Sequence, residues 1–196
     1  MKVVRHTVFR GLSGTPNGRP VRSLLVNFKD IKDIARFLRN GVLAYRHNPI
    51  VRRAAIDAVM ANSAPEKNKL AQAVAIATWV KQNCYYVHEP DEVFQTPENT
   101  LRERSGDCDD FTWLQCAMME SIGIPSKMNL VRIGGYWKHI YPSMMVKTGP
   151  GAGQTRNVPL DATLTLWPEE FPSPEQIARE QGEGEVYVMV YPPLSF

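Results

Sequence analysis

The sequence lacks long apolar runs. No stretch approaches the roughly 18 apolar residues that a membrane-spanning helix requires. The N-terminus is basic and interrupted by polar residues, so it lacks the apolar segment of a signal peptide. We therefore expect a protein that does not enter a membrane, is not exported by a signal peptide and works in the cytoplasm.

Cysteine is scarce, and no cofactor motif is visible. Cys84, Cys108 and Cys116 are an odd number without a secretion signal, which predicts reduced thiols in place of disulfides. Their spacing matches no zinc pattern. The glycine-rich stretch 149–154 lacks the Lys-Ser/Thr pair of a phosphate-binding loop, and residues 106–110 offer few and mixed ligands for an ion. We expect no metal and no cofactor.

The net charge of +3 hides an uneven distribution. Residues 1–60 contain twelve Lys and Arg against three Asp and Glu, or +9, and the remainder contains eleven against seventeen, or −6. This imbalance predicts that the first third of the chain meets an acidic partner or the chain's own acidic part, or is a solvated basic face. It lacks an aromatic-interleaved or helix-turn-helix pattern, so nucleic-acid binding is not expected.

The chain is organised around residues 105–125. Asp107 is a good helix N-cap, with another acidic residue, Asp110, three positions later. Gly123 fits the left-handed position after the last helical turn, and Pro125 prevents continuation. The residues between are apolar on nearly all sides, which predicts a buried helix that begins at Cys108.

The position of Cys108 suggests chemistry. The N–H groups at a helix N-terminus carry about half a positive charge, which stabilises a thiolate and the oxyanion formed when it attacks a carbonyl. The neighbouring Asp109 and Asp110 oppose a thiolate, so activation would come mainly from a histidine. The alternative is a small buried cysteine that only packs.

The remaining pattern predicts an α+β fold, in which two strands and a run of helices precede the cysteine and antiparallel strands follow it. The expected helices are residues 30–40, ended by Gly41, then 50–62, 66–83 and 97–104, with a short one at 175–181. The expected strands are residues 2–9, 21–28, 127–133, 136–147, 157–160 and 186–191, with a hairpin turn at Gly134-Gly135.

A histidine and an aspartate that come later in the sequence than Cys108 complete the set of side chains that thiol chemistry needs. His139 lies early in the second hairpin strand, and Asp161 follows the next strand. An imidazole can take the thiol proton and later protonate the leaving amine, while a carboxylate fixes the imidazole tautomer. His88, at the start of a loop, is the alternative base.

Several motifs are shared with a known family. They are Ala75–Tyr86, the Pro97–Phe111 segment with Gly-Asp-Cys-Asp-Asp-Phe, Gly123-Ile-Pro125, the strand with His139, and Val158–Asp161. Over about residues 66–165 the chain resembles the transglutaminase-like superfamily of cysteine peptidases, which has a papain-like fold. The resemblance implies a central Cys-bearing helix packed on an antiparallel sheet, within a domain of residues 49–196. Residues 1–48 would be a basic, peripheral docking arm.

The resemblance also implies roles for individual residues. Cys108 would be the nucleophile, His139 the base and Asp161 its orienting partner. Gln95 and Tyr86 are candidates to bind the oxyanion together with the Cys108 N–H group. The implied reaction is hydrolysis of peptide or amide bonds through a thioester, in a partner protein or in the peptide stems of peptidoglycan. Hydrolysis is favoured over cross-linking because no calcium-site pattern is visible.

Small proteins with this form of the motif are frequent in phages and prophages, often near tail or other virion genes. The resemblance therefore suggests a viral source and a virion- or tail-associated protein. The alternative function is a catalytically silent structural component of a virion, which keeps the fold and binds phage structural proteins through its basic N-terminal region.

Overall fold

The computed structural model describes residues 6–11, 22–27, 30–88, 93–148, 154–164, 176, 179–180 and 185–192. The helices are α1 (Ile31–Tyr45), α2 (Pro49–Ala61), α3 (Lys69–Asn83), α4 (Pro97–Glu103) and α5 (Cys108–Ser121). The strands are β1 (His6–Gly11), β2 (Arg22–Asn27), β3 (Tyr85–Tyr86), β4 (Ser105–Gly106), β5 (Lys127–Ile133), β6 (Tyr136–Lys147), β7 (Thr155–Pro159) and β8 (Val186–Tyr191). The helix expected at 175–181 lies largely outside the described residues.

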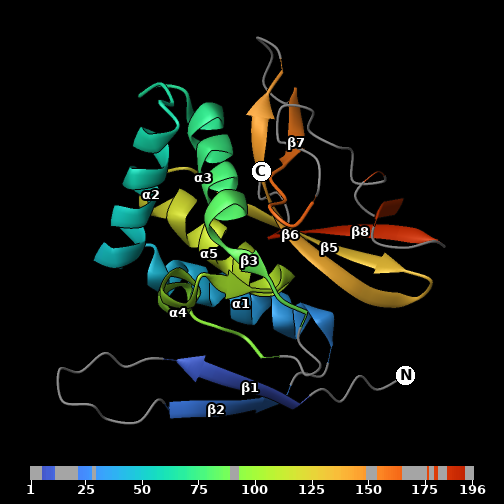
Figure 1. Cartoon of the computed structure of the whole chain (residues 1–196). Coiled ribbons are helices and arrows are strands. Elements are labelled where there is room, and N and C mark those ends of the chain that lie inside the picture. The colour runs from blue at the N-terminus through green and yellow to red at the C-terminus, as the bar shows by residue number, and fades with distance from the viewer. Residues whose placement is uncertain are drawn as a thin grey trace.

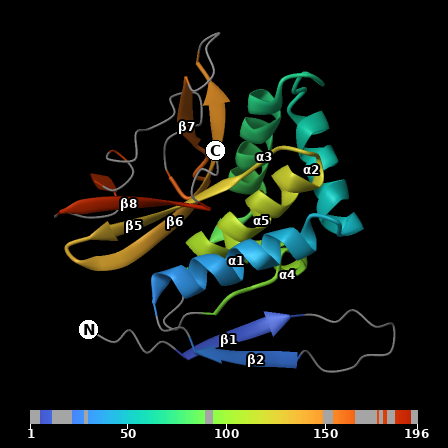
Figure 2. The ribbon, with the colours of Figure 1, turned by 180° about the vertical axis from the view of Figure 1, so that it is seen from behind.

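Helix α5 lies at the centre of the fold, between the other helices and the main sheet (Figures 1 and 2). That sheet is antiparallel, with strand order β7-β6-β5-β8. The turn between β5 and β6 has φ values of 56° at Gly134 and 86° at Gly135, which glycine adopts without strain. The predicted α+β class and hairpin are confirmed. None of the helices in the described part of the chain is both long and apolar enough to cross a membrane.

Cationic side chains from α1 and α2 bind the C-terminal end of α5. Arg39 pairs with Glu120, and the Arg52 guanidinium donates to the backbone carbonyl of Ser121. Cations are stabilising there because the C-terminal end of a helix dipole is negative. Part of the basic excess of residues 1–60 is therefore used inside the molecule.

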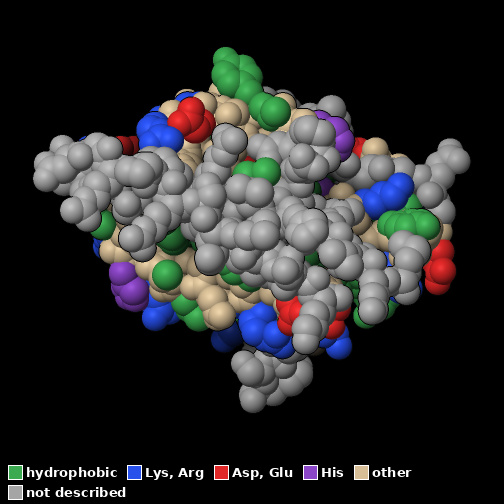
Figure 3. Space-filling view, turned by 90° about the horizontal axis from the view of Figure 1, so that it is seen from below, with side chains coloured by type: hydrophobic (Ala, Val, Ile, Leu, Met, Phe, Trp, Pro, Cys, Tyr) green, Lys and Arg blue, Asp and Glu red, His purple; other side chains and the backbone are tan. Residues whose placement is uncertain are grey.

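The remaining described cations do not form one patch on the lower face of the molecule. Figure 3 shows the described Lys and Arg side chains of this face in separate places near its rim, some of them beside acidic groups. The two strands expected in this region are present, and β1 and β2 pair antiparallel. The binding of a partner by residues 1–60 stays a prediction.

Helix α1 belongs to the core. Its buried residues Ala35, Leu38 and Val42 pack in one cluster with Trp113 of α5. This differs from the peripheral position expected for the whole of residues 1–48, because the apolar face of α1 covers one side of α5. The division of the chain near residue 48 itself stays a prediction.

The prediction that Gly41 ends the first helix was wrong. The helix continues to Tyr45, and the glycine serves close packing instead. A Cβ atom at residue 41 would lie only 2.3 Å from the indole ring of Trp113. The missing side chain therefore lets α1 approach the central helix.

This packing predicts the effect of adding one methyl group. In an open helix interior, Gly→Ala raises stability by about 0.5–1 kcal/mol. We expect Gly41→Ala to lower the free energy of unfolding by about 1–3 kcal/mol instead, because the methyl group overpacks the site. Urea unfolding measures this, with the exposed neighbour Asn40→Ala as the control. A more stable Gly41→Ala protein would contradict the packing.

Candidate active site

Cys108 is the first residue of α5, as predicted. The N-cap Asp107 accepts a hydrogen bond from the Asp109 N–H at 3.2 Å, and Asp110 accepts one from the Asp107 N–H at 3.4 Å. This capping box fixes the first turn of the helix. The Cys108 side chain is partly exposed, whereas Cys84 and Cys116 are buried. The one accessible thiol therefore lies at the positive end of a buried helix.

His139 and Asp161 meet in a buried hydrogen bond. The distance from His139 Nε2 to Asp161 Oδ2 is 2.5 Å, and the two side chains are 2% and 1% exposed. The other carboxylate oxygen accepts hydrogen bonds from the N–H and the hydroxyl of Thr163, at 2.8 and 2.7 Å. The carboxylate is thus held from both sides, and it fixes the orientation of the imidazole.

The imidazole also interacts with the thiol. Burial works to lower the pKa of His139, but the charge and hydrogen bond of Asp161 outweigh it, helped by a hydrogen bond and charge from Cys108. Together these raise the pKa of His139 to about 10. Because Nε2 is used by Asp161, Nδ1 is the nitrogen that remains for the thiol. His139 thus contacts Asp161 directly and interacts with Cys108, and a triad of Cys108, His139 and Asp161 stays a prediction.

Thr112 ties the helix to the strand beside these groups. Its hydroxyl lies 2.7 Å from the carbonyl oxygen of Cys108 and 3.1 Å from that of Ile140, which follows His139. The residue is fully buried. Sequence analysis did not single it out, although a polar residue one helical turn after the cysteine on a buried helix was a visible signal.

Tyr86 lies beside the turn that carries Cys108. Its backbone is in register with Gly106 in the parallel β3–β4 pair, and its ring packs edge-on against Phe111 at 6.2 Å between centroids. Burial raises the pKa of Tyr86 most, followed by the charges of Cys108 and of the nearby aspartates. The phenol therefore keeps its proton and can donate a hydrogen bond, and a role of Tyr86 in binding the oxyanion stays a prediction.

Gln95, the other candidate for the oxyanion, has a different set of partners. Its side-chain amide donates to Asp110 at 3.2 Å and to the Ser105 carbonyl at 3.4 Å. Its backbone N–H also donates to Asp110, at 2.6 Å. A role in oxyanion binding stays a prediction for Gln95, and it would require the amide to leave these partners.

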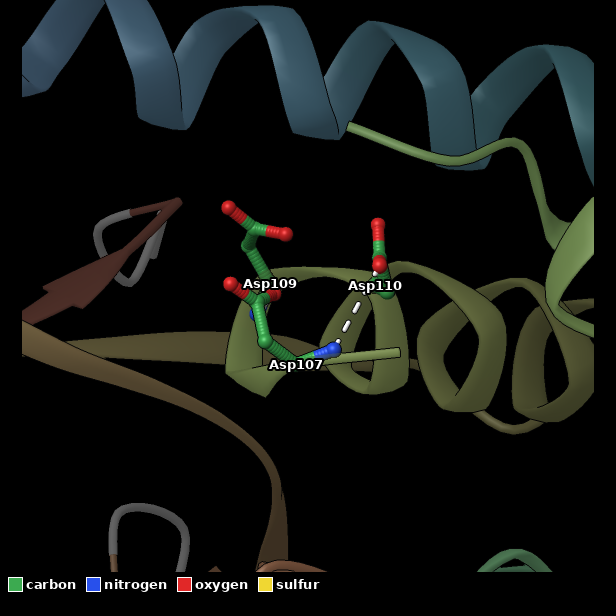
Figure 4. Close-up of side chains that lie close together, drawn as sticks. All are labelled: Asp107, Asp109 and Asp110. Atoms are coloured by element: carbon green, nitrogen blue, oxygen red, sulfur yellow. Dashed lines mark hydrogen bonds between the residues drawn. The ribbon is translucent and has the colours of Figure 1, made fainter. Parts of the chain in front are cut away.

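Three carboxyl groups lie close together at the start of α5. One oxygen from each of Asp107, Asp109 and Asp110 falls within 4.8 Å of the others, and Figure 4 shows the three side chains. Burial raises the pKa of Asp109 well above its ordinary value, and the charges of Asp110 and Asp107 raise it further. Carboxylates are ligands for hard cations, so these residues could hold an ion. The expectation of no metal stays a prediction.

The other thiols and the alternative base are placed differently. Burial raises the pKa of Cys116 to about 12 and also raises the pKa of Cys84. His88 is exposed. Among the three cysteines, all of which the structure describes, Cys108 is therefore the one that interacts with a histidine, and that histidine is hydrogen-bonded to a carboxylate.

Comparison with known families identifies the fold. The family model of the transglutaminase-like superfamily matches residues 57–162, more than half of the chain. The chain belongs to the transglutaminase-like superfamily. The expected family is confirmed, and the matched region of this transglutaminase-like chain contains Cys108, His139 and Asp161. No curated protein matches the chain.

Solved structures with related folds come from several bacteria. A Parabacteroides distasonis protein assigned as a protease aligns with a TM-score of 0.47 and 16% identity, over 76% of this chain and 34% of the other. LapG of Legionella pneumophila aligns with a TM-score of 0.44 and 15% identity, over 70% and 75%. A Cytophaga hutchinsonii protein assigned as a cysteine protease gives 0.44 and 14%, over 79% and 57%. The chain thus spans about a third of the Parabacteroides protein.

The raised pKa of His139 predicts how stability depends on pH. In the unfolded chain a histidine has a pKa near 6.5. Stabilisation by the protonated imidazole is therefore complete below about pH 6.5 and is lost as the pH rises towards about 10. The Cys108 thiol would mask this effect, because a thiol that becomes a thiolate in the folded state loses one proton while the imidazole gains one, and the net proton uptake on folding is then zero.

The prediction is therefore tested in a Cys108→Ser background. Urea unfolding from pH 6 to 10 compares Cys108→Ser with the double variant Cys108→Ser, His139→Gln, so that other titrating groups cancel. We expect a stability difference of about 2 kcal/mol at pH 6, the size of a hydrogen bond to a charged group, that shrinks as the pH rises above about 6.5. A difference that does not change with pH would contradict the buried imidazolium.

Proposed function

We propose that the protein is a cysteine hydrolase that cleaves peptide or amide bonds through a thioester at Cys108. The observation that supports this best is the buried His139–Asp161 hydrogen bond, together with the interaction of His139 with Cys108, the accessible one of the three cysteines. The superfamily and the relatives assigned as proteases point to the same chemical class.

In the proposed reaction, the thiol proton passes to Nδ1 of His139, and the thiolate attacks the substrate carbonyl. The C–N bond then breaks, the imidazolium gives its proton to the leaving amine, and a thioester to Cys108 remains. His139 next takes a proton from water, which attacks the thioester and releases the acid and the free thiol. Asp161 keeps the imidazole oriented and stabilises its positive charge through both steps.

The oxyanion that forms during attack needs hydrogen-bond donors. The backbone N–H of Cys108 is one, because the first N–H groups of a helix have no partner within the helix. The Tyr86 hydroxyl is the second donor in this proposal. Tyr86 pairs with Gly106, two residues before Cys108, and burial and the charge of Cys108 raise the pKa of its phenol, so it keeps its proton. Peptides of a partner protein and peptidoglycan stems are the proposed substrates. The association with a phage virion or tail stays a prediction.

The thiol mechanism predicts a loss of activity in Cys108→Ala. The wild-type protein and this variant are incubated with peptidoglycan fragments and with casein-derived peptides, and the products are followed by mass spectrometry. We expect products with the wild type alone. In parallel, iodoacetamide at pH 6 should alkylate Cys108 at least about tenfold faster than Cys84, because only a thiolate reacts readily. Equal products from both proteins, or equally slow alkylation, would reject the mechanism.

The role of Tyr86 predicts a loss of turnover in Tyr86→Phe. Removing one oxyanion donor costs about 100-fold in kcat, and the ring contact with Phe111 is kept, so KM should change little. Tyr85→Phe is the matched control, because Tyr85 is 78% exposed and adjacent in the chain. Equal kcat in wild type and Tyr86→Phe would remove this residue from the site.

A further inference from the structure

We propose that Asp110 is a positioning residue, whose carboxylate fastens the segment around Gln95 to the turn that carries Cys108. Its effect on turnover rests on the proposed thiol chemistry, whereas its effect on the reactivity of the thiol does not. The residue is fully buried and lies two positions after Cys108, in the first turn of α5.

The carboxylate of Asp110 accepts hydrogen bonds from two directions. On one side, Oδ1 accepts from the Gln95 backbone N–H at 2.6 Å, and Oδ2 accepts from the Gln95 side-chain amide at 3.2 Å. On the other side, Oδ2 accepts from the Asp107 N–H at 3.4 Å. A helix cap alone requires only the last of these bonds. The two bonds to Gln95 join a segment thirteen residues upstream of the nucleophile to its turn.

Gly106 leaves room for the Asp110 side chain because it has no Cβ atom. A Cβ atom at residue 106 would lie 2.8 Å from both Cβ and Oδ2 of Asp110. The backbone of Gly106 is in register with Tyr86, and its carbonyl accepts a hydrogen bond from the Val87 N–H at 3.0 Å. Asp110 therefore packs against the β3–β4 strand pair, which contains Tyr86.

The contacts require a carboxylate and not merely a polar group of the same shape. All three bonds are donated by N–H groups, and a carboxylate accepts at both oxygens. In Asp110→Asn, the new NH₂ group would face an N–H donor on one side. Asp109 provides a contrast, because its Oδ1 atom is buried without a hydrogen-bond partner.

Charge and position make opposite predictions for the thiol. A negative charge near a thiol disfavours the thiolate. If Asp110 acted only through its charge, Asp110→Asn would make Cys108 more reactive at low pH. If it positions the turn, the variant loosens the contact between Cys108 and His139, and Cys108 becomes less reactive. The sign of the change in reactivity therefore separates the two.

The experiment measures the alkylation of Cys108 by iodoacetamide at pH 6 in the full chain, with peptide mapping to confirm the modified residue. We expect Asp110→Asn to react about tenfold more slowly than the wild type, because small displacements of reacting groups cost large factors in rate. Asp109→Asn is the matched control and should stay within about twofold, since Asp109 Oδ1 has no hydrogen-bond partner that the substitution would remove. Asp110→Asn reacting as fast as the wild type, or faster, would overturn the proposal.

Further measurements separate this role from plain loss of structure. Far-UV circular dichroism and the melting temperature establish that Asp110→Asn is folded. If Asp110→Asn is not folded, Gly106→Ala is used in its place. The added methyl group displaces the same Asp110 carboxylate and should slow the alkylation of Cys108 by the same factor. Unchanged alkylation in Gly106→Ala would overturn the proposal. Hydrogen exchange at the Gln95 N–H should become faster in either variant. Wild-type protein in EDTA should alkylate at an unchanged rate, and a loss equal to that of Asp110→Asn would make Asp110 a cation ligand instead.

Turnover supplies the last comparison. With a peptide substrate, Asp110→Asn should lower kcat and leave KM within about twofold, because the substrate-facing groups are unchanged. A wild-type protein that alkylates rapidly at Cys108 but cleaves no peptide would reject the proposed function. The alkylation result for Asp110→Asn would still decide the positioning role.

Discussion

The positive N-terminal end of a buried helix is the interaction on which the rest of the site depends. Helix α5 is enclosed by helices on one side and the sheet on the other, so few waters can screen its dipole. Both ends are neutralised by side chains: Asp107 and Asp110 cap the start, and Arg39 and Arg52 bind the end. Cys108 thus lies where N–H groups and an anion attract one another most strongly.

The same caps create a conflict, because carboxylates beside a sulfur oppose the thiolate. The structure resolves it in a different way for each residue. Burial and its acidic neighbours raise the pKa of Asp109, which favours the neutral carboxyl group. The carboxylate of Asp110 accepts hydrogen bonds from three N–H groups, which stabilise its negative charge. His139 supplies the opposing positive charge, which Asp161 maintains at neutral pH.

The placement of helix α5 relative to the main sheet determines the distances between the proposed reacting groups. The helix provides the sulfur, strand β6 provides the imidazole, and Asp161, two residues after the end of β7, provides the carboxylate. Thr112 bridges the backbone of the first helical turn and that of β6, and Gly41 lets α1 press on the other side of α5. Because these contacts are buried and close, small changes in packing reach the thiol.

The sequence by itself determined the features that depend on local pattern. The caps of α5, the glycine turn at Gly134-Gly135 and the order of the longer helices and strands were predicted correctly, because capping, turn geometry and apolar periodicity depend on neighbouring residues. The two-residue strands β3 and β4 were not predicted. Gly41 was misread as a stop, since its reason is an indole ring contributed by a residue 72 positions later.

Only the tertiary structure decided which polar groups meet. Sequence order made His139 and Asp161 candidates, but the packing of β6 and β7 against α5 set the 2.5 Å contact and the burial that shifts the pKa of the imidazole. The hydrogen-bond partners of Gln95 and those of Thr112 could not be predicted from the sequence for the same reason. Hydrogen bonds and desolvation depend on distances across the fold, and no local pattern encodes those distances.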